Sequence, residues 1–199
     1  MMAMPLDEER GPDEAELLAA YARGDVAAAR ILTAQLAPRV YAQAYRMLGD
    51  TAEAEDVAQE AMMRLWRVAP DWRAGEAKVS TWLYRVAANL CTDRLRRRRR
   101  AVPGLDAVPE PADPAPSAEA GLQAAARTDA LSRALAALPE RQRLAVVLRH
   151  IEGLANPEIA QIMEIGVEAV ESLTARGKRA LRAALAPQRQ ALGFEDDAI

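Results

Sequence analysis

Residues 51–68 read TAEAEDVAQEAMMRLWRV. Apolar side chains recur in this stretch every three or four positions, at Val57, Ala61, Leu65 and Val68. Because this spacing places them on one face of an α-helix, it predicts a helix that packs on a core. The other face carries mainly acid, amide and basic groups, in Asp56, Gln59, Glu60, Met63 and Arg64. That face is either an ordinary solvated surface or a binding surface for a basic partner.

The composition of the whole chain also favours helix. The 199 residues are 51% hydrophobic and only 4% aromatic, and Ala and Leu supply most of the apolar side chains. No run alternates apolar and polar residues as a half-buried strand does. We therefore predict an all-α protein with one or two small domains.

Several classes of protein are disfavoured by what the sequence lacks. No apolar run approaches the roughly 18 residues of a membrane-spanning helix, and the acidic start has no signal-peptide core. One cysteine, Cys91, cannot form an internal disulfide, and His150 is the only histidine. These residues are too few for a zinc site or a nucleophile–base pair. We expect a cytoplasmic protein that is not an enzyme, with no cofactor, no metal and no membrane insertion. Cys91 should pack as a small hydrophobe, and His150 should be half-buried.

A proline-rich segment, residues 101–126, divides the chain. It contains Pro103, Pro109, Pro111, Pro114 and Pro116 and no basic residue. Because proline fixes φ and lacks a backbone donor, a continuous helix is excluded there, and we predict an acidic, flexible to semi-rigid linker. It separates a first domain, residues 13–100, from a second domain, residues 127–188.

Positive charge is concentrated in these two domains. The chain has a formal net charge of −3, yet residues 38–100 hold 13 Lys and Arg against 8 Asp and Glu. Residues 127–190 hold 10 against 7. Such local excesses of positive charge attract a nucleic-acid backbone even in an acidic protein.

Turn and capping residues place the helix boundaries. In the first domain we expect helices over residues 13–22, 26–36, 38–48, 51–68 and 79–100. In the second we expect them over residues 127–138, 140–151, 157–164 and 167–186. The predicted caps are Asp25, Asp50 in a box with Glu53, and Asn156, and the predicted turn glycines are Gly24, Gly49 and Gly166.

The last helix of the first domain combines cations with aromatic rings. Holding an unstacked DNA strand requires cations for its phosphates and flat rings for its bases. The candidates are Trp72, Lys78, Ser80, Thr81, Trp82, Tyr84, Arg85, Asn89, Arg94, Arg96 and Arg97. Trp82 fits core packing equally well. The six arginines among residues 94–100 favour contact with a polyanion over a merely solvated helix end.

Residues 156–186 have the apolar spacing of a helix-turn-helix, which lays its second helix in the major groove of DNA. The candidates on that helix are Glu168, Glu171, Ser172, Ala175 and Arg176 for base edges. Lys178, Arg179 and Arg182 are better placed for phosphates or for solvent. Because a carboxylate repels phosphate, Glu168 or Glu171 either helps to select sequence or points off the DNA.

Taken in order, these segments resemble the sigma-70 family, and most closely its small two-domain members, the extracytoplasmic-function (group IV) sigma factors. The resemblance is carried by residues 38–41, 45–50, 54–60 and 63–66 in the first domain. In the second it runs from residues 138–143 through residues 153–154, 158–160 and 170–172 to Arg176. The chain departs from the pattern at Ala88, where arginine is frequent, at residues 155–157, and at Glu171, where lysine is common.

The resemblance implies an RNA polymerase sigma factor that directs the core enzyme to promoters and initiates transcription. Asp56, Gln59 and Glu60, with Met63 and Arg64, would bind the clamp helices of the largest polymerase subunit. The first domain would read and melt the −10 element, holding a flipped base in the loop of residues 71–79. The second domain would read the −35 element and contact the polymerase flap. The linker would run near the active-site channel and could mimic nucleic acid there. The resemblance also implies stress-responsive control by an anti-sigma factor.

Two other classes of protein remain open from the residues alone. One is a helix-turn-helix repressor or activator whose first domain dimerises or senses a signal. The other is a helical adaptor that binds only protein. The pairing of residues 54–60 with the basic helix disfavours the repressor or activator, whereas the adaptor predicts that no complex contains DNA.

Overall fold

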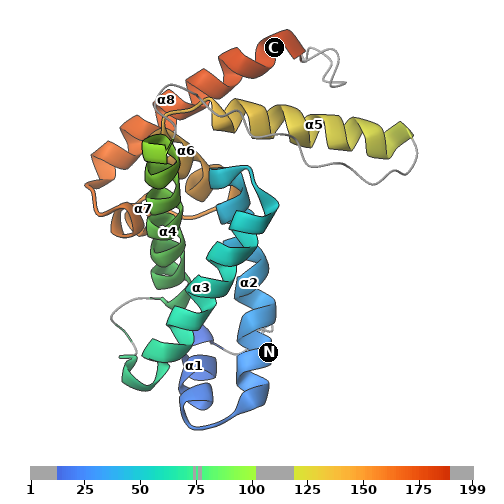
Figure 1. The fold of residues 1–199 in the computed structure, drawn as a ribbon. Helices are drawn as coiled ribbons and strands as arrows, with labels where there is room; N and C mark the ends of the chain where they lie inside the picture. The colour runs from blue at the N-terminus through green and yellow to red at the C-terminus, as the bar shows by residue number, and fades with distance from the viewer. Residues whose placement is uncertain (1–12, 74, 76–77, 102–118, 189–199) are drawn as a thin grey trace, which may run out of the picture.

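The computed structural model describes residues 13–73, 75, 78–101 and 119–188, and every regular element within these residues is helical. The first group contains α1 (Glu14–Ala22), α2 (Val26–Leu48), α3 (Thr51–Val68), the short turn η1 (Ala69–Asp71) and α4 (Val79–Ala101). The second contains α5 (Glu119–Ala136), α6 (Glu140–Val146), the π-helical turn η2 (Val147–Ile151), α7 (Asn156–Met163), α8 (Val167–Leu185) and η3 (Ala186–Gln188). The predicted all-α fold is confirmed (Figure 1).

In the first group, α2, α3 and α4 lie side by side and α1 packs at the lower end of α2 (Figure 1). The apolar stripe of α3 faces this core, because Val57, Ala61 and Leu65 are each fully buried. Cys91 of α4 is buried in the same core, and burial raises the pKa of its thiol to about 12. The thiol is therefore a packing group, as predicted.

The capping predictions in the first group are largely confirmed. Asp25 accepts the backbone N–H groups of Ala27 and Ala28 and so begins α2. Gly49 ends α2 with a left-handed φ of 69°. Asp50 accepts the N–H of Glu53 at 2.8 Å. The Glu53 carboxylate, however, bonds to Arg98 of α4 at 2.9 Å and so ties α3 to another helix.

The predicted break between two helices before Pro38 is wrong, since α2 runs through it without interruption. Proline removes one backbone donor from a helix interior. Here Pro38 lies on the exposed side of α2, while Leu36 and Val40 on either side of it are buried. Packing of this buried face outweighs the lost hydrogen bond, because most helix stability in proteins comes from tertiary contacts.

The second group begins earlier than expected. α5 starts at Glu119, inside the segment predicted to be linker, and residues 102–118 of that segment lie outside the described residues. Leu135, Leu138, Val146 and Val147 form a small core of their own. At the crossing of α6 and α8, Gly177 is buried and leaves no room for a side chain, because a Cβ there would lie 2.5 Å from Cγ2 of Val146.

The helix-turn-helix forms with turn chemistry that differs from the prediction. Ala155, not Asn156, precedes the first turn of α7, and its N–H is bound by the Glu158 carboxylate at 3.0 Å. Gly166 has an ordinary φ of −70°, whereas the left-handed residue between the helices is Glu164, at φ 52°. An apolar pattern locates such a turn but does not identify which residue adopts the positive φ.

The two groups pack directly on each other. α7 lies against α4 (Figure 1). Buried residues of the second group belong to the same core cluster as the first, namely Leu144, Leu148, Ile159, Ile162 and Val170. This contact was not foreseen, because hydrophobic periodicity does not report which helices meet.

Candidate functional site

A groove of about 430 Å³ lies between α3 and α4. One wall contains all five predicted α3 residues, Asp56, Gln59, Glu60, Met63 and Arg64, and the other contains Leu90, Asp93, Arg94 and Arg97. The α3 side chains share this wall because they lie opposite the buried stripe. Leu90 and Asp93 were not among the predicted residues, since only the crossing of the two helices brings them to the groove.

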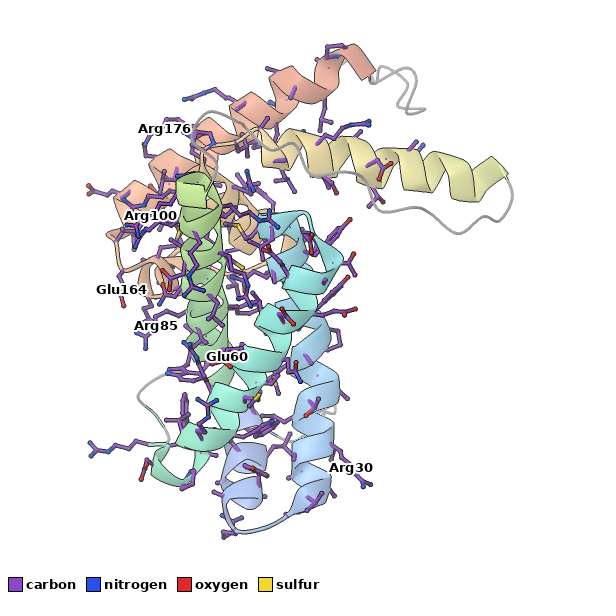
Figure 2. All side chains as sticks on the ribbon, in the orientation of Figure 1. Arg30, Glu60, Arg85, Arg100, Glu164 and Arg176 are labelled. Carbon is purple, nitrogen blue, oxygen red and sulfur yellow. The ribbon has the colours of Figure 1, made fainter. Side chains whose placement is uncertain are left out.

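The groove combines charge with an exposed apolar centre. Arg64 Nε donates to Glu60 Oε1 at 2.8 Å, and this hydrogen bond lowers the pKa of the Glu60 carboxyl. Met63 is 46% exposed between these polar groups. Figure 2 labels Glu60 on α3. The surface therefore suits a partner helix that presents both charged and apolar side chains.

The aromatic candidates before and within α4 form a pair. Trp72 and Trp82 meet edge to face, with ring centroids 6.0 Å apart and an interplanar angle of 87°. Both are partly buried against the core, so Trp82 packs while part of it remains accessible. The Ser80 N–H donates to Glu14 at 2.9 Å, which orients the start of α4. Residues 74, 76 and 77 of the expected base-holding loop lie outside the described residues.

Two of the α4 residues that were expected to contact DNA are buried. Thr81 is 6% exposed and Tyr84 is 1% exposed. Tyr84 donates its hydroxyl to Glu152 at 3.0 Å, its ring lies under the Arg39 guanidinium, and burial raises the pKa of its phenol. Neither residue is accessible to a DNA base in this conformation, which corrects the expectation of direct contact. Asn89, by contrast, is exposed.

The arginines at the end of α4 have different surroundings. Arg94 and Arg97 line the α3–α4 groove, whereas Arg96 is exposed and lies 4.0 Å from Asp93. Arg98 turns inward and donates to the Leu48 carbonyl and the Glu53 carboxylate. Because adjacent helical residues point about 100° apart, a continuous basic run cannot act as one surface.

Cations of the first group meet carboxylates of the second. Lys78 Nζ lies 2.7 Å from Glu158 Oε1, and Arg85 Nη1 lies 3.8 Å from Glu164 Oε1. Figure 2 shows Arg85 and Glu164 as neighbours beside α4. The hydrogen bond with Lys78 and a second one from the Ala155 backbone lower the pKa of the Glu158 carboxyl. These partners could not be predicted from local patterns, since about 80 residues separate them along the chain.

The predicted residues of α8 form one accessible surface. Glu168, Glu171, Ser172, Ala175, Arg176, Lys178 and Arg179 are all exposed. Glu171 accepts a hydrogen bond from the Asn156 side chain at 3.3 Å, and Arg176 Nε donates to the Ser172 carbonyl at 3.2 Å. A helix that presents such a row beyond a tight turn can enter a DNA major groove.

Comparison with known proteins identifies both halves of the chain. The family described as Sigma-70 region 2 matches residues 32–101, and Sigma-70, region 4 matches residues 128–181. The chain belongs to the sigma-70 family. The α3–α4 groove and the α4 aromatic pair thus lie in region 2, and the helix-turn-helix lies in region 4.

Several similar proteins are extracytoplasmic-function (ECF) sigma factors. The chain is 33% identical over 153 residues to the ECF RNA polymerase sigma factor SigW of Bacillus subtilis, covering 72% of this chain and 81% of the relative. It is 37% identical over 159 residues to the ECF sigma factor SigE of Mycolicibacterium smegmatis, covering 78% of this chain and 60% of the relative. It is therefore an ECF member of the family.

Solved structures share this fold. The structure of CnrH in complex with the cytosolic domain of CnrY superposes with a TM-score of 0.64 and 26% identity, covering 88% of this chain and 99% of that one. The sigma factor RpoE of Bartonella quintana, solved with the anti-sigma factor NepR, gives a TM-score of 0.62 at 22% identity, covering 79% and 96%. The second likeness supports the fold alone.

Membership of this family assigns the general function. The protein is a sigma factor, which directs core RNA polymerase to promoters in transcription initiation, and it is not itself an enzyme. This decides against both the repressor and the adaptor interpretations. Within the described ranges no helix is long and apolar enough to cross a membrane. The same ranges contain no cluster of His, Cys, Asp and Glu suited to a metal ion.

Proposed function

We propose that the α3–α4 groove is the surface through which this sigma factor binds core RNA polymerase, at the clamp helices of the largest subunit. One observation carries the proposal: all five α3 residues expected to bind the polymerase line a single groove that also contains an exposed methionine. Arg94 and Arg97, first considered as DNA contacts, complete its basic wall.

A charge reversal tests this surface. Asp56→Lys should weaken binding to core polymerase at least about tenfold, because a like charge inside an interface costs several kcal/mol. Glu55→Lys is the matched control, since Glu55 is the adjacent exposed residue and lies outside the groove. Pull-down with tagged core polymerase and a fluorescence titration provide the measurement. Equal effects of the two substitutions would reject the groove as the docking surface.

We propose further that the first domain, residues 13–100, reads and melts the −10 element. Trp72, Lys78, Ser80, Trp82 and Arg85 surround the start of α4, where rings and cations can hold an unstacked strand. Exposed Asn89 extends this surface, and exposed Arg96 is suited to duplex phosphates. Thr81 and Tyr84 would support it from beneath rather than contact bases.

The second domain, residues 127–188, would read the −35 element through α8 and contact the polymerase flap. The support is the row of exposed polar side chains beyond the tight turn of the helix-turn-helix. Transcription in vitro from the promoter upstream of the protein's own gene, with core polymerase and this sigma factor, tests the assignment. Initiation should depend on both the −10 and the −35 sequences.

We also propose stress-responsive control by an anti-sigma factor. The support is that CnrH, 26% identical to this chain, was solved bound to the cytosolic domain of a second protein, CnrY. Co-purification from cells at the native expression level tests this. A partner that dissociates under stress and blocks initiation in vitro is the expected result.

A further inference from the structure

We propose that Glu14 of α1 is a positioning residue of the −10 surface. It caps the first turn of α4 from another helix and so fixes the side chains that meet the DNA strand. This inference rests on the assignment of the −10 element to the first domain made above. It adds a residue that precedes residues 32–101, the part of the chain that Sigma-70 region 2 matches.

The first turn of α4 needs a cap that its own sequence does not supply. The first backbone N–H groups of a helix have no partner within the helix, and the residue before the first turn usually offers a side-chain acceptor. In α4 that residue is Lys78, whose carbonyl accepts the Trp82 N–H at 3.1 Å. A lysine side chain carries only donors. An acceptor for this turn therefore has to come from another residue or from water.

Glu14 supplies that acceptor. Its Oε2 accepts the Ser80 N–H at 2.9 Å, in a partly buried contact. Ser80 is the second residue of α4, a position that a cap side chain commonly binds. A carboxylate at the start of a helix also interacts favourably with the helix dipole. Because Leu17 and Leu18 of α1 are buried in the core, the helix that carries this carboxylate is held in place.

The same helix supports both elements that carry the aromatic pair. α1 contacts η1 and α4, and it lies below the start of α4 in Figure 1. Leu18 belongs to the buried cluster that contains Ala69 of η1 and Val79 of α4. Trp72 follows η1 directly, Trp82 lies in the first turn of α4, and their ring centroids are 6.0 Å apart. α1 is thus packed where it can fix the two rings relative to each other.

The cap should affect the reading of bases more than the holding of phosphates. Phosphate contacts bind a strand whatever its sequence, whereas contacts with bases give specificity. Lys78 and Arg85 have long cationic side chains that can reach phosphates even if the first turn of α4 frays. Ser80 and Trp82 can recognise bases only if the backbone of that turn is fixed. Loss of the Glu14 hydrogen bond should therefore reduce discrimination between sequences.

The first experiment measures this discrimination in the holoenzyme. The probes are two labelled single strands, one with the non-template −10 sequence of a promoter that the holoenzyme transcribes and one with those bases scrambled. The readout is the ratio of the two affinities. In Glu14→Ala this ratio should fall about twofold to fivefold, since loss of a cap shifts the equilibrium of a helical first turn by about fivefold. A merely structural defect lowers the active fraction and leaves the ratio unchanged.

Three variants serve as matched controls. Asp25→Ala removes the same kind of contact beyond the other end of α1, because Asp25 accepts the N–H groups of Ala27 and Ala28 at the start of α2. Glu16→Ala removes a negative charge from an exposed position of α1 itself. Both should leave the ratio unchanged. Glu14→Gln keeps an oxygen acceptor of the same reach and should retain most of the discrimination.

Three results of this experiment would overturn the proposal. The first is an unchanged ratio in Glu14→Ala. The second is an equal fall in Asp25→Ala, because the loss of any cap in the first domain would then have the same effect. The third is an equal fall in Glu14→Ala and Glu14→Gln, which would assign the effect to charge and not to the hydrogen bond.

The second experiment tests the cap in the free protein, without polymerase or DNA. Hydrogen exchange of single backbone amides is followed by NMR in the full chain. In Glu14→Ala the Ser80 amide should exchange about fivefold faster, by the same shift in the first-turn equilibrium. The amide of Leu90, further along α4, should be unaffected. Unchanged exchange at Ser80 would overturn the proposal, and so would equal acceleration of both amides, which would mean that Glu14 stabilises the fold as a whole.

The proposed function and the positioning role fail in different ways. If the unmodified holoenzyme does not distinguish the two strands, the −10 assignment is wrong and the positioning role falls with it. The exchange of the Ser80 amide still reports in that case whether Glu14 caps α4. If the unmodified holoenzyme distinguishes the strands and Glu14→Ala does so equally well, only the positioning role is wrong.

Discussion

At the scale of single residues, Gly177 shows how tertiary packing reverses a local preference. Alanine is favoured over glycine within a helix by about 1 kcal/mol. At this position, however, a Cβ would lie 2.5 Å from Cγ2 of Val146 and 3.2 Å from the Gln142 carbonyl oxygen. Neither neighbour can move easily, because valine is stiff at χ1 and the oxygen belongs to the backbone.

We therefore expect Gly177→Ala to lower the free energy of unfolding by about 1–3 kcal/mol, the usual effect of overpacking. Urea denaturation followed by circular dichroism measures it. The double variant Gly177→Ala and Val146→Ala should lose less than the sum of the two single variants. Additive losses would show that the predicted clash is absent.

At the scale of secondary-structure elements, the arginine run of α4 separates into structural and functional positions. Arg98 bonds to the Leu48 carbonyl at the end of α2 and to Glu53 in the first turn of α3. It thereby fastens three helices. Arg100, two residues further on, is exposed.

Arg98→Ala should accordingly destabilise the protein by about 1 kcal/mol, the net contribution of a partly exposed hydrogen-bonding group. Arg100→Ala should leave the free energy of unfolding unchanged. Thermal denaturation of the two variants side by side gives the comparison. If both variants melt at a similar temperature, the hydrogen bonds of Arg98 do not stabilise the protein.

The recognition helix α8 supports a prediction about DNA. Arg176→Ala should weaken holoenzyme binding to a −35 duplex, by about 1–3 kcal/mol if Arg176 reads a base. A phosphate contact would instead lower the slope of log affinity against log salt by about one. Fluorescence anisotropy over a salt series distinguishes the two roles. If the variant gives the same binding isotherm as the unmodified protein, Arg176 does not contact the −35 duplex.

At the scale of the whole molecule, the contact between domains depends on ionisation. The Glu158 carboxyl has a pKa below its ordinary value of 4.5, chiefly because of its hydrogen bond with Lys78. A lowered folded-state pKa contributes stability above the ordinary value, and that stability is lost as the pH falls through the folded-state pKa. The contact should therefore weaken below pH 4.5.

For this exposed pair we expect the loss to be about 0.5 kcal/mol. Urea denaturation at pH 7 and at several acidic values should show a steeper loss of stability in the unmodified protein than in Glu158→Gln. Other carboxylates titrate in both proteins, so only the difference between the curves is informative. Parallel curves would exclude Glu158 from the pH dependence.

Local signals in the chain determined its helices, several of its caps and the family to which it belongs. Some features depend only on neighbours within a few residues and can be predicted from sequence. These are the apolar stripe of Val57, Ala61 and Leu65, the cap at Asp25 and the left-handed Gly49. Tertiary structure alone decided that α2 continues through Pro38, that Tyr84 is buried, and that Arg94 and Arg98 face different surroundings. It also decided that Glu158 meets Lys78. Periodicity identifies the apolar face of a helix, but what covers that face depends on packing between residues far apart in the chain.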